Sequence, residues 1–363
     1  MKLSIITINY NNAAGLRKTI ESVLAQTYTD IEYIIVDGGS SDESVDVVRE
    51  YESSLASRLK WVSERDSGIY NAMNKGIEIA LGRRVVRDDH TSAPLASSPH
   101  RLIASDYIQI LNSGDILAAP DVTERMMAAL EAQQVKGERL KVKGDEEVKG
   151  NEEVKGERLK AKGLENGEAD TCASRLSPLT SKLTSDSAQA SRLENCPAIF
   201  YGNMTKVNAA GQIVGKSGYT EYSLRQFYSS TLNHDCAYIR ADLFEEYGLY
   251  DENLKIVSDW KWYLQAIGLG RVKPEYVDID VTIFDDGGIS ETNLELRNKE
   301  RRQVLEELLP PAVLWDYDTH AFEMEQMNRL KRWKLYSLVY FMERVLFKLE
   351  KWGILGERRK VRG

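Results

Sequence analysis

The sequence predicts an α/β fold with a mixed, mainly parallel sheet and helices on both faces. Up to about residue 115, short runs rich in β-branched and aromatic residues alternate with segments of helical spacing. Each run ends in a polar or glycine-bearing turn, as at Asn112-Ser113-Gly114-Asp115. Such alternation is typical of parallel sheets covered by helices. Because ligands bind beyond the carboxyl ends of such strands, we expect the functional residues in these turns.

The first half of the chain gives the clearest elements. We expect strands over residues 3–8, 32–36, 60–63 and 107–111. We expect helices over residues 14–26, 43–52 and 69–81. The first of these helices carries its apolar residues at helical spacing, and Ser41 or Asp42 is a suitable N-cap for the second. Further on, a strand is predicted over 237–240, with helices over 241–247 and 258–268, the last capped by Ser258.

Two stretches interrupt this pattern. Residues 83–105 replace a short helix-to-strand connection, and we interpret them as a surface insertion. Residues 134–197 are predicted to be a disordered low-complexity insertion: Val-Lys-Gly-Glu-Arg-Leu-Lys occurs at Val135 and again at Val154, and acids and bases nearly balance. Such a segment cannot bury enough apolar surface to offset the entropy of ordering it.

Composition narrows the class of protein. The 363 residues are 42% hydrophobic and 29% charged, as in a globular protein, and the net charge of −8 argues against a nucleic-acid binder. The cysteines Cys172, Cys196 and Cys236 are widely spaced, which fits a reducing cytoplasm. Met1-Lys2 leads straight into a strand pattern, so we expect no signal peptide. We also find no run approaching the roughly 18–20 apolar residues of a membrane span.

Four stretches, in this order, resemble the inverting family 2 glycosyltransferases of the bacterial surface-polysaccharide type, whose fold is called GT-A. The stretches are Ser4-Ile5-Ile6-Thr7-Ile8-Asn9-Tyr10-Asn11, Ile35-Val36-Asp37-Gly38-Gly39-Ser40-Ser41-Asp42, Leu111 to Asp115, and Ser258-Asp259-Trp260. Between them, Ser63 to Gly76 looks like the nucleotide-side loop of that family. The resemblance covers residues 1–82, 106–133 and 198–290. It implies a nucleotide-sugar-binding half over 1–133 and an acceptor-side half over 198–310.

The resemblance assigns the donor site to the first half. Thr7 and Tyr10 would line the base, with Tyr10 offering a face for stacking, and Asp37 would accept a hydrogen bond from a uracil N–H. Glu64 and Asp66 would lie beside the ribose and diphosphate. The donor would then be a nucleotide-diphosphate sugar, specifically a UDP-sugar. Asp37 also fits a simple turn before two glycines.

The same resemblance assigns a metal ligand. Asp115 would hold Mg²⁺ or Mn²⁺, because hard cations take oxygen ligands, and the ion would neutralise the leaving diphosphate. Asn112 and Gly114 stand where many relatives carry Asp; Asn112 could accept from ribose or coordinate through its carbonyl. An ordinary loop leaving a strand is the alternative reading of this turn.

Asp259 matches the general base of the family, which takes the proton of the acceptor hydroxyl in a single inverting displacement. A carboxylate in the first turn of a helix is also favoured by the helix dipole alone. His234 and Trp260 could contact the diphosphate or the acceptor; a structural His and a core Trp are the alternatives. Gly287-Gly288-Ile289-Ser290 looks like the family's closing loop, or a turn.

The C-terminal residues 311–363 are predicted to form a basic amphipathic helical tail. From Arg329 to Gly363 there are eleven Lys or Arg against three Glu, interleaved with aromatic and aliphatic residues. Such helices bind anionic membrane surfaces, or else dock their apolar face on the catalytic domain or a second subunit. A peripheral position on the inner face of the cell membrane would suit a lipid-linked acceptor.

The predicted reaction is therefore sugar transfer to a glycan or lipid-linked acceptor in cell-surface polysaccharide biosynthesis. The main alternative is a catalytically inactive relative that only binds the nucleotide sugar. A nicotinamide dehydrogenase is disfavoured, since no Gly-X-Gly-X-X-Gly follows the first strand. A glycoside hydrolase with paired carboxylates remains a third reading.

Overall fold

The computed structural model describes residues 1–87, 89–94, 105–135, 196–208, 210–285 and 293–351. The chain divides into two compact units, residues 1–300 and 301–363. Almost all of the low-complexity insertion predicted at 134–197, and the glycine loop predicted at 287–290, lie outside the described residues.

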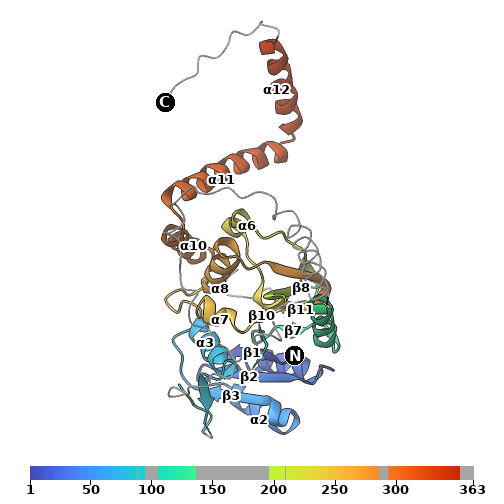
Figure 1. Ribbon diagram of the computed structural model, residues 1–363, viewed down its shortest axis with the longest axis vertical. Helices are drawn as coiled ribbons and strands as arrows, with labels where there is room; N and C mark the ends of the chain where they lie inside the picture. The colour runs from blue at the N-terminus through green and yellow to red at the C-terminus, as the bar shows by residue number, and fades with distance from the viewer. Residues whose placement is uncertain (88, 95–104, 136–195, 209, 286–292, 352–363) are drawn as a thin grey trace, which may run out of the picture. The chain divides into compact units, whose positions relative to one another are not determined.

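The first half of the sheet is parallel, as predicted. Its strands lie in the order β3-β2-β1-β6, every neighbouring pair parallel (Figure 1). These strands are β1 (Leu3–Asn9), β2 (Ile31–Asp37), β3 (Leu59–Ser63) and β6 (Tyr107–Ile110). The predicted strands at 3–8, 32–36, 60–63 and 107–111 are therefore confirmed to within a residue or two.

Helices cover both faces of this half because the buried side chains alternate along each strand. Leu3 and Ile5 belong to the core that includes buried side chains of α1 (Ala13–Leu24) and α2 (Ser44–Leu55). Ile6 points to the opposite face, toward α3 (Ile69–Ala80): a Cβ on Gly76 of α3 would collide with the Ile6 side chain. The glycine thus lets α3 lie close against the sheet, and the predicted helical layers are confirmed.

The second half of the sheet is mixed. β10 joins the two halves through antiparallel pairing with β6, and β8 pairs with β10, β11 and β9. Only β8 and β11 run parallel here, while β7 closes the edge beside β11. The strands are β7 (Ile116–Leu117), β8 (Ile199–Val207), β9 (Ile213–Ser217), β10 (Ala237–Arg240) and β11 (Pro274–Asp285).

Four local expectations differ from the structure. Residues 83–105, interpreted as a surface insertion, contain a hairpin of β4 (Arg84–Val86) and β5 (Ser92–Pro94). His90 of this hairpin stacks on Trp61, with 3.7 Å between the two ring centroids. The helix predicted over 258–268 is α8 (Ser258–Tyr263) followed by a π-helical turn to Leu269. Ser258 does not cap it: Val257 is the N-cap, and no hydrogen-bond partner of the Ser258 hydroxyl is found in the described chain. The helix predicted over 241–247 is only α7 (Leu243–Glu246).

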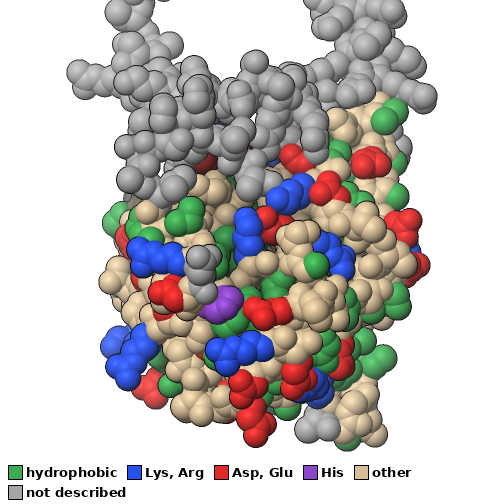
Figure 2. Space-filling model, turned by 90° about the horizontal axis from the view of Figure 1, so that it is seen from below, with side chains coloured by type: hydrophobic (Ala, Val, Ile, Leu, Met, Phe, Trp, Pro, Cys, Tyr) green, Lys and Arg blue, Asp and Glu red, His purple; other side chains and the backbone are tan. Residues whose placement is uncertain are grey.

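The remaining helices are α6 (Leu224–Ser229), α10 (Leu294–Leu308), α11 (Pro311–Arg332) and α12 (Tyr336–Lys351). The predicted helical character of the tail is thus confirmed for its described part. Of the helices that are described, none has the length and apolarity to cross a membrane. Figure 2 shows acidic and basic side chains interspersed over the face that it presents, with hydrophobic side chains scattered between them.

Candidate active site

The carboxyl ends of β1, β2 and β6 meet at one edge of the sheet, and the chain turns carry polar side chains there. Tyr10 follows β1, Asp37 ends β2, and the turn 112–115 follows β6. His234 lies just before β10, the strand next to β6, and contacts both Asn112 and Asp259. Residues before and after the insertion at 134–197 thus lie together at one candidate site.

Tyr10, Gly38 and Asp66 lie close together at the ends of β1 and β2. Tyr10 is 66% exposed, so its ring is available for stacking. A Cβ on Gly38 would lie 2.5 Å from Asp66 Oδ2 and 3.2 Å from Tyr10 Cδ2, so a glycine is required for this close approach. Burial raises the pKa of Asp66, whose Oδ1 accepts a hydrogen bond from the Gly68 N–H at the start of α3.

Thr7 and Asp37 differ from the expectation that their side chains face the base. Thr7 is fully buried, and its hydroxyl accepts a hydrogen bond from Tyr33 at 3.1 Å. Asp37 is also fully buried: its two oxygens accept hydrogen bonds from Asn9, from Ser40 and from the Ser63 hydroxyl. In this structure the two side chains hold the strand ends together through these bonds, and their contacts with a base stay a prediction.

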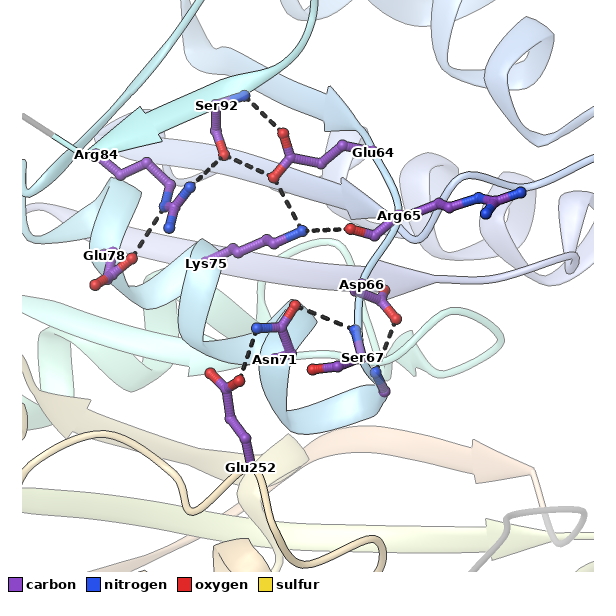
Figure 3. Close-up of polar contacts among 11 residues, drawn as sticks. Glu64, Arg65, Asp66, Ser67, Asn71, Lys75, Glu78, Arg84, Ser92 and Glu252 are labelled. Carbon is purple, nitrogen blue, oxygen red and sulfur yellow. Dashed lines mark hydrogen bonds and ion pairs between the residues drawn. The ribbon is translucent and has the colours of Figure 1, made fainter.

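Glu64 is likewise occupied by protein groups (Figure 3). Its carboxylate accepts from the N–H and hydroxyl of Ser92 at 2.8 and 2.9 Å and pairs with Lys75 Nζ at 2.9 Å. Lys75 also donates to the Arg65 carbonyl at 2.9 Å. Burial alone would raise the pKa of Glu64, but the hydrogen bonds from Ser92 and Lys75 hold it below its ordinary range. Glu64 thus fixes the hairpin and the loop 64–68 onto α3.

The turn after β6 depends on glycine. Gly114 has φ +111°, a region that strains any residue with a side chain, so the absence of Asp at this motif position follows from the backbone. Thr19 of α1 fixes the turn, because its hydroxyl accepts from the Gly114 N–H at 3.0 Å and donates to the Asp115 carbonyl at 2.8 Å. Asp115 is 5% exposed.

Asp115 has a second carboxylate beside it. The side chains of Asp115 and Asp235 are hydrogen-bonded, and burial raises the pKa of Asp235. The Asn112 Oδ1 atom nearby is buried, with no hydrogen-bond partner found in the part of the chain that the structure describes. Two carboxylates sharing a proton and an orphaned amide oxygen form an oxygen donor set that suits Mg²⁺ or Mn²⁺. Within the described ranges, no group of three or more His, Cys, Asp or Glu could hold a metal, so diphosphate oxygens or water would have to complete such a shell.

Asp259 is held on both carboxylate oxygens. Oδ1 accepts from the Tyr70 hydroxyl at 2.9 Å, and Oδ2 lies 3.2 Å from His234 Nδ1. Burial alone would raise the pKa of Asp259, but the hydrogen bonds from His234 and Tyr70 hold it below its ordinary range. Burial alone would lower the pKa of His234, yet the charges of Asp235 and Asp259 raise it to about 9. The pair is thus an aspartate facing a protonated imidazole.

Trp260 is a core residue. It is 1% exposed, and its indole N–H donates to the Phe227 carbonyl at 2.8 Å, as the alternative of a core Trp predicts. Sequence reasoning missed three members of the site, Tyr70, Lys75 and Asp235. The first two lie within the quoted stretch Ser63 to Gly76, and the third directly follows His234. Their roles depend on contacts between distant segments, which no local pattern shows.

Comparison with known proteins shows that part of the chain is similar to glycosyltransferases. Residues 4–91 match the family model described as "Glycosyl transferase family 2". An uncharacterized glycosyltransferase of Nostoc sp. is 36% identical over 130 residues, which are 34% of this chain and 39% of the relative. A PGL/p-HBAD biosynthesis glycosyltransferase of Mycobacterium tuberculosis is 40% identical over 79 residues, 22% of this chain and 31% of the relative. The chain therefore spans less than half the length of these curated relatives.

The fold is shared with S. aureus TarS 1-349, solved in complex with UDP-GlcNAc. The TM-score is 0.50 at 13% identity, over 84% of this chain and 64% of that chain. The matched segment contains Tyr10, Asp37 and Asp66, which meet at the candidate site. Residues 4–91 are thus similar to glycosyl transferase family 2, and the chain has a GT-A fold.

Proposed function

We propose that this protein transfers a sugar from a UDP-sugar to a hydroxyl of a glycan or lipid-linked acceptor, with inversion, in the synthesis of cell-surface polysaccharide. The observation that carries the proposal is the position of Asp259, an aspartate fixed by Tyr70 and His234 beside the strand ends that form the donor side. TarS, which shares the fold, was solved with UDP-GlcNAc.

The donor would bind across the ends of β1 and β2. The exposed Tyr10 ring supplies a stacking surface for the base, and Asp66 lies within reach of the ribose and diphosphate. Asp37, Thr7 and Glu64 support this surface through their internal partners. Asp37 could still accept from uracil if the Ser40 or Ser63 hydroxyl turned away.

Mg²⁺ or Mn²⁺ would be held by Asp115, with Asn112 and Asp235 beside it. Bound there, a divalent cation neutralises the charge that develops on the leaving diphosphate. Two carboxylates and an amide fit a cation that keeps several ligand positions for phosphate and water. His234, being cationic and adjacent to both Asp235 and Asp259, would favour negative charge in the same place.

Asp259 would act as the general base. Its carboxylate stays ionised near neutral pH because its pKa is lowered, so it can accept a proton from the acceptor hydroxyl as that oxygen attacks the anomeric carbon. One displacement from the face opposite the diphosphate inverts the configuration, and the proton ends on the Asp259 carboxylate. A covalent intermediate is not needed.

The test is an Asp259→Asn variant assayed with UDP-sugars. We expect turnover, including donor hydrolysis, to fall by about 10²–10⁴-fold, the usual contribution of a general base, while UDP affinity stays unchanged. If wild type and variant bind UDP equally and neither turns it over, the inactive nucleotide-sugar-binding alternative is correct. Glycan cleavage without any nucleotide would instead support a hydrolase.

We further propose that α12 lies on an anionic membrane surface, as a peripheral protein of the inner face would. Aromatic and aliphatic side chains of α12 are exposed, among them Phe341 at 63% and Phe347 at 68%. Between Arg329 and Lys351, seven Lys or Arg stand against two Glu, although the whole chain has a net charge of −8. This local positive charge complements anionic lipid, and the apolar side chains can enter the interface.

Vesicle sedimentation tests this placement. The full chain should bind vesicles containing phosphatidylglycerol more strongly than pure phosphatidylcholine vesicles, and a Phe341→Ser, Phe347→Ser double variant should lose that binding while keeping UDP affinity. Equal recovery of both proteins in the supernatant would contradict the proposal. A concentration-dependent dimer that the double variant abolishes would show that a second copy covers α12 instead.

A further inference from the structure

The hydroxyl of Tyr70 is one of the two side-chain groups that donate to the Asp259 carboxylate, and the Trp260 backbone N–H also contributes. Tyr70 lies in α3 and Asp259 in α8, and the hydrogen bond between their side chains is 2.9 Å long. Tyr70 is 5% exposed, and burial together with the Asp259 charge raises its pKa well above the ordinary value, so the phenol remains a donor. With His234 on the other oxygen, the plane of the carboxylate is fixed.

Tyr70 lies in the first turn of α3, directly after the loop 64–68, which we call the donor loop. Asp66 accepts from the Gly68 N–H at 3.0 Å, and the Ser67 N–H donates to Asn71 at 3.4 Å (Figure 3). Lys75, one turn further, holds the Arg65 carbonyl. The loop 64–68 and the side chain that touches Asp259 are therefore parts of one rigid segment.

A second set of bonds ties the same helix to the loop before α8. Asn74 bonds the Tyr250 backbone in both directions, at 2.9 and 3.0 Å. Glu252 accepts from Asn71 at 2.8 Å and from Asn74 at 2.9 Å, and Figure 3 shows Asn71 and Glu252 reaching toward each other. Two residues of the loop leading to Asp259 are thus bound to α3 independently of Tyr70.

We propose that Tyr70 is a positioning residue for Asp259, and that α3 sets the distance between the general base and the donor loop. The inference rests on the proposed role of Asp259. A base must face the acceptor hydroxyl within hydrogen-bond reach, and a misplacement of about 1 Å can cost on the order of 10²-fold in rate. Without the Tyr70 hydroxyl, the carboxylate would keep only His234 and the Trp260 backbone N–H among the partners in the described chain.

The test compares Tyr70→Phe with Tyr250→Phe. The two rings are 5.8 Å apart, but the Tyr250 hydroxyl has no hydrogen-bond partner among the residues that the structure describes. With rates normalised to UDP-binding sites counted by calorimetry, we expect Tyr70→Phe to lose about 10–100-fold in kcat, with donor KM and UDP affinity unchanged. Tyr250→Phe should retain the wild-type kcat.

A purely structural role would lower the melting temperature of Tyr70→Phe but leave kcat per UDP site at the wild-type value; that result would overturn the proposal. If Tyr70→Phe does not fold, Glu252→Ala decides, because Glu252 is exposed: its kcat should fall several-fold with unchanged UDP affinity, and a wild-type kcat would refute the link through α3. Asp259→Asn in the same assay separates the two proposals. If Asp259→Asn keeps full turnover, the assignment of Asp259 as general base fails. If Asp259→Asn loses turnover while Tyr70→Phe and Glu252→Ala keep it, only the positioning role of Tyr70 fails.

Discussion

Lys75 should contribute far more to the free energy of unfolding than an ordinary surface lysine does. The variant Lys75→Met tests this. Methionine keeps the length and apolar stem of the side chain but removes the ammonium. The lysine side chain is 10% exposed and makes two bonds of 2.9 Å, to Glu64 and to the Arg65 carbonyl. A bond to a charged partner contributes about 1.5–3 kcal/mol and one to a neutral carbonyl about 0.5–1.5 kcal/mol.

Two effects reduce that total. The ammonium no longer has to be desolvated, and Glu64 keeps its two bonds from Ser92 while 20% of its side chain remains exposed to water. We therefore expect Lys75→Met to lower the free energy of unfolding by about 2–3 kcal/mol. Lys60→Met is the matched control. The Lys60 side chain is 39% exposed, and its partner Glu32 retains Lys2, so this change should cost less than about 1 kcal/mol.

The assay is urea unfolding of each full-length variant, comparing midpoints at unchanged slope. UDP titration of the folded proteins should show weaker binding for Lys75→Met alone, because the loop 64–68 loses its attachment to α3. If the midpoints of the two lysine variants coincide, Lys75 is an ordinary ion pair and the account of the donor loop is wrong.

Two further changes probe the same side of the site. Gly38→Ala should weaken UDP binding at least tenfold, because its Cβ would collide with Asp66 and approach Tyr10. The control Gly215→Ala should bind UDP like wild type, because its Cβ would meet only one atom, at 3.8 Å. Equal UDP affinities of the two variants would contradict the role of Gly38 in this packing. Glu64→Gln should lower the melting temperature at pH 7. Because the folded pKa of Glu64 lies below its ordinary 4.5, its contribution is present above that value and lost as pH falls through the folded pKa. The difference between Glu64→Gln and wild type should therefore narrow in acid, and a constant difference would show that the charge is not responsible.

The sequence predicted the first half of the fold well because each element there carries a local signal. The strands of that half are short apolar runs ending in polar turns, and the helices between them have apolar residues at helical spacing. The second half was harder, because β9 and the hairpin 84–94 consist largely of polar or exposed residues, so their strand structure depends on pairing with other strands. Ile213 of β9, for example, is 72% exposed.

The candidate site shows the same division. Tyr10, Asp66, Asp115, His234 and Asp259 were selected from motifs, and the structure brings them to one edge of the sheet. The surroundings of each side chain could not be predicted. Thr7 shares a motif with the exposed Tyr10, and Asp37 belongs to the next motif, yet both are buried: Thr7 lies within β1, and the turn after β2 closes over Asp37.

Calorimetric titration of the purified protein with UDP, with and without Mn²⁺, tests the central claim most directly. The donor site proposed at the ends of β1, β2 and β6 predicts UDP binding that requires the ion and is lost in Asp115→Ala, with Lys60→Met as a variant that binds normally. A folded protein that binds neither UDP nor GDP under either condition would contradict the assignment of this site to a nucleotide-sugar donor.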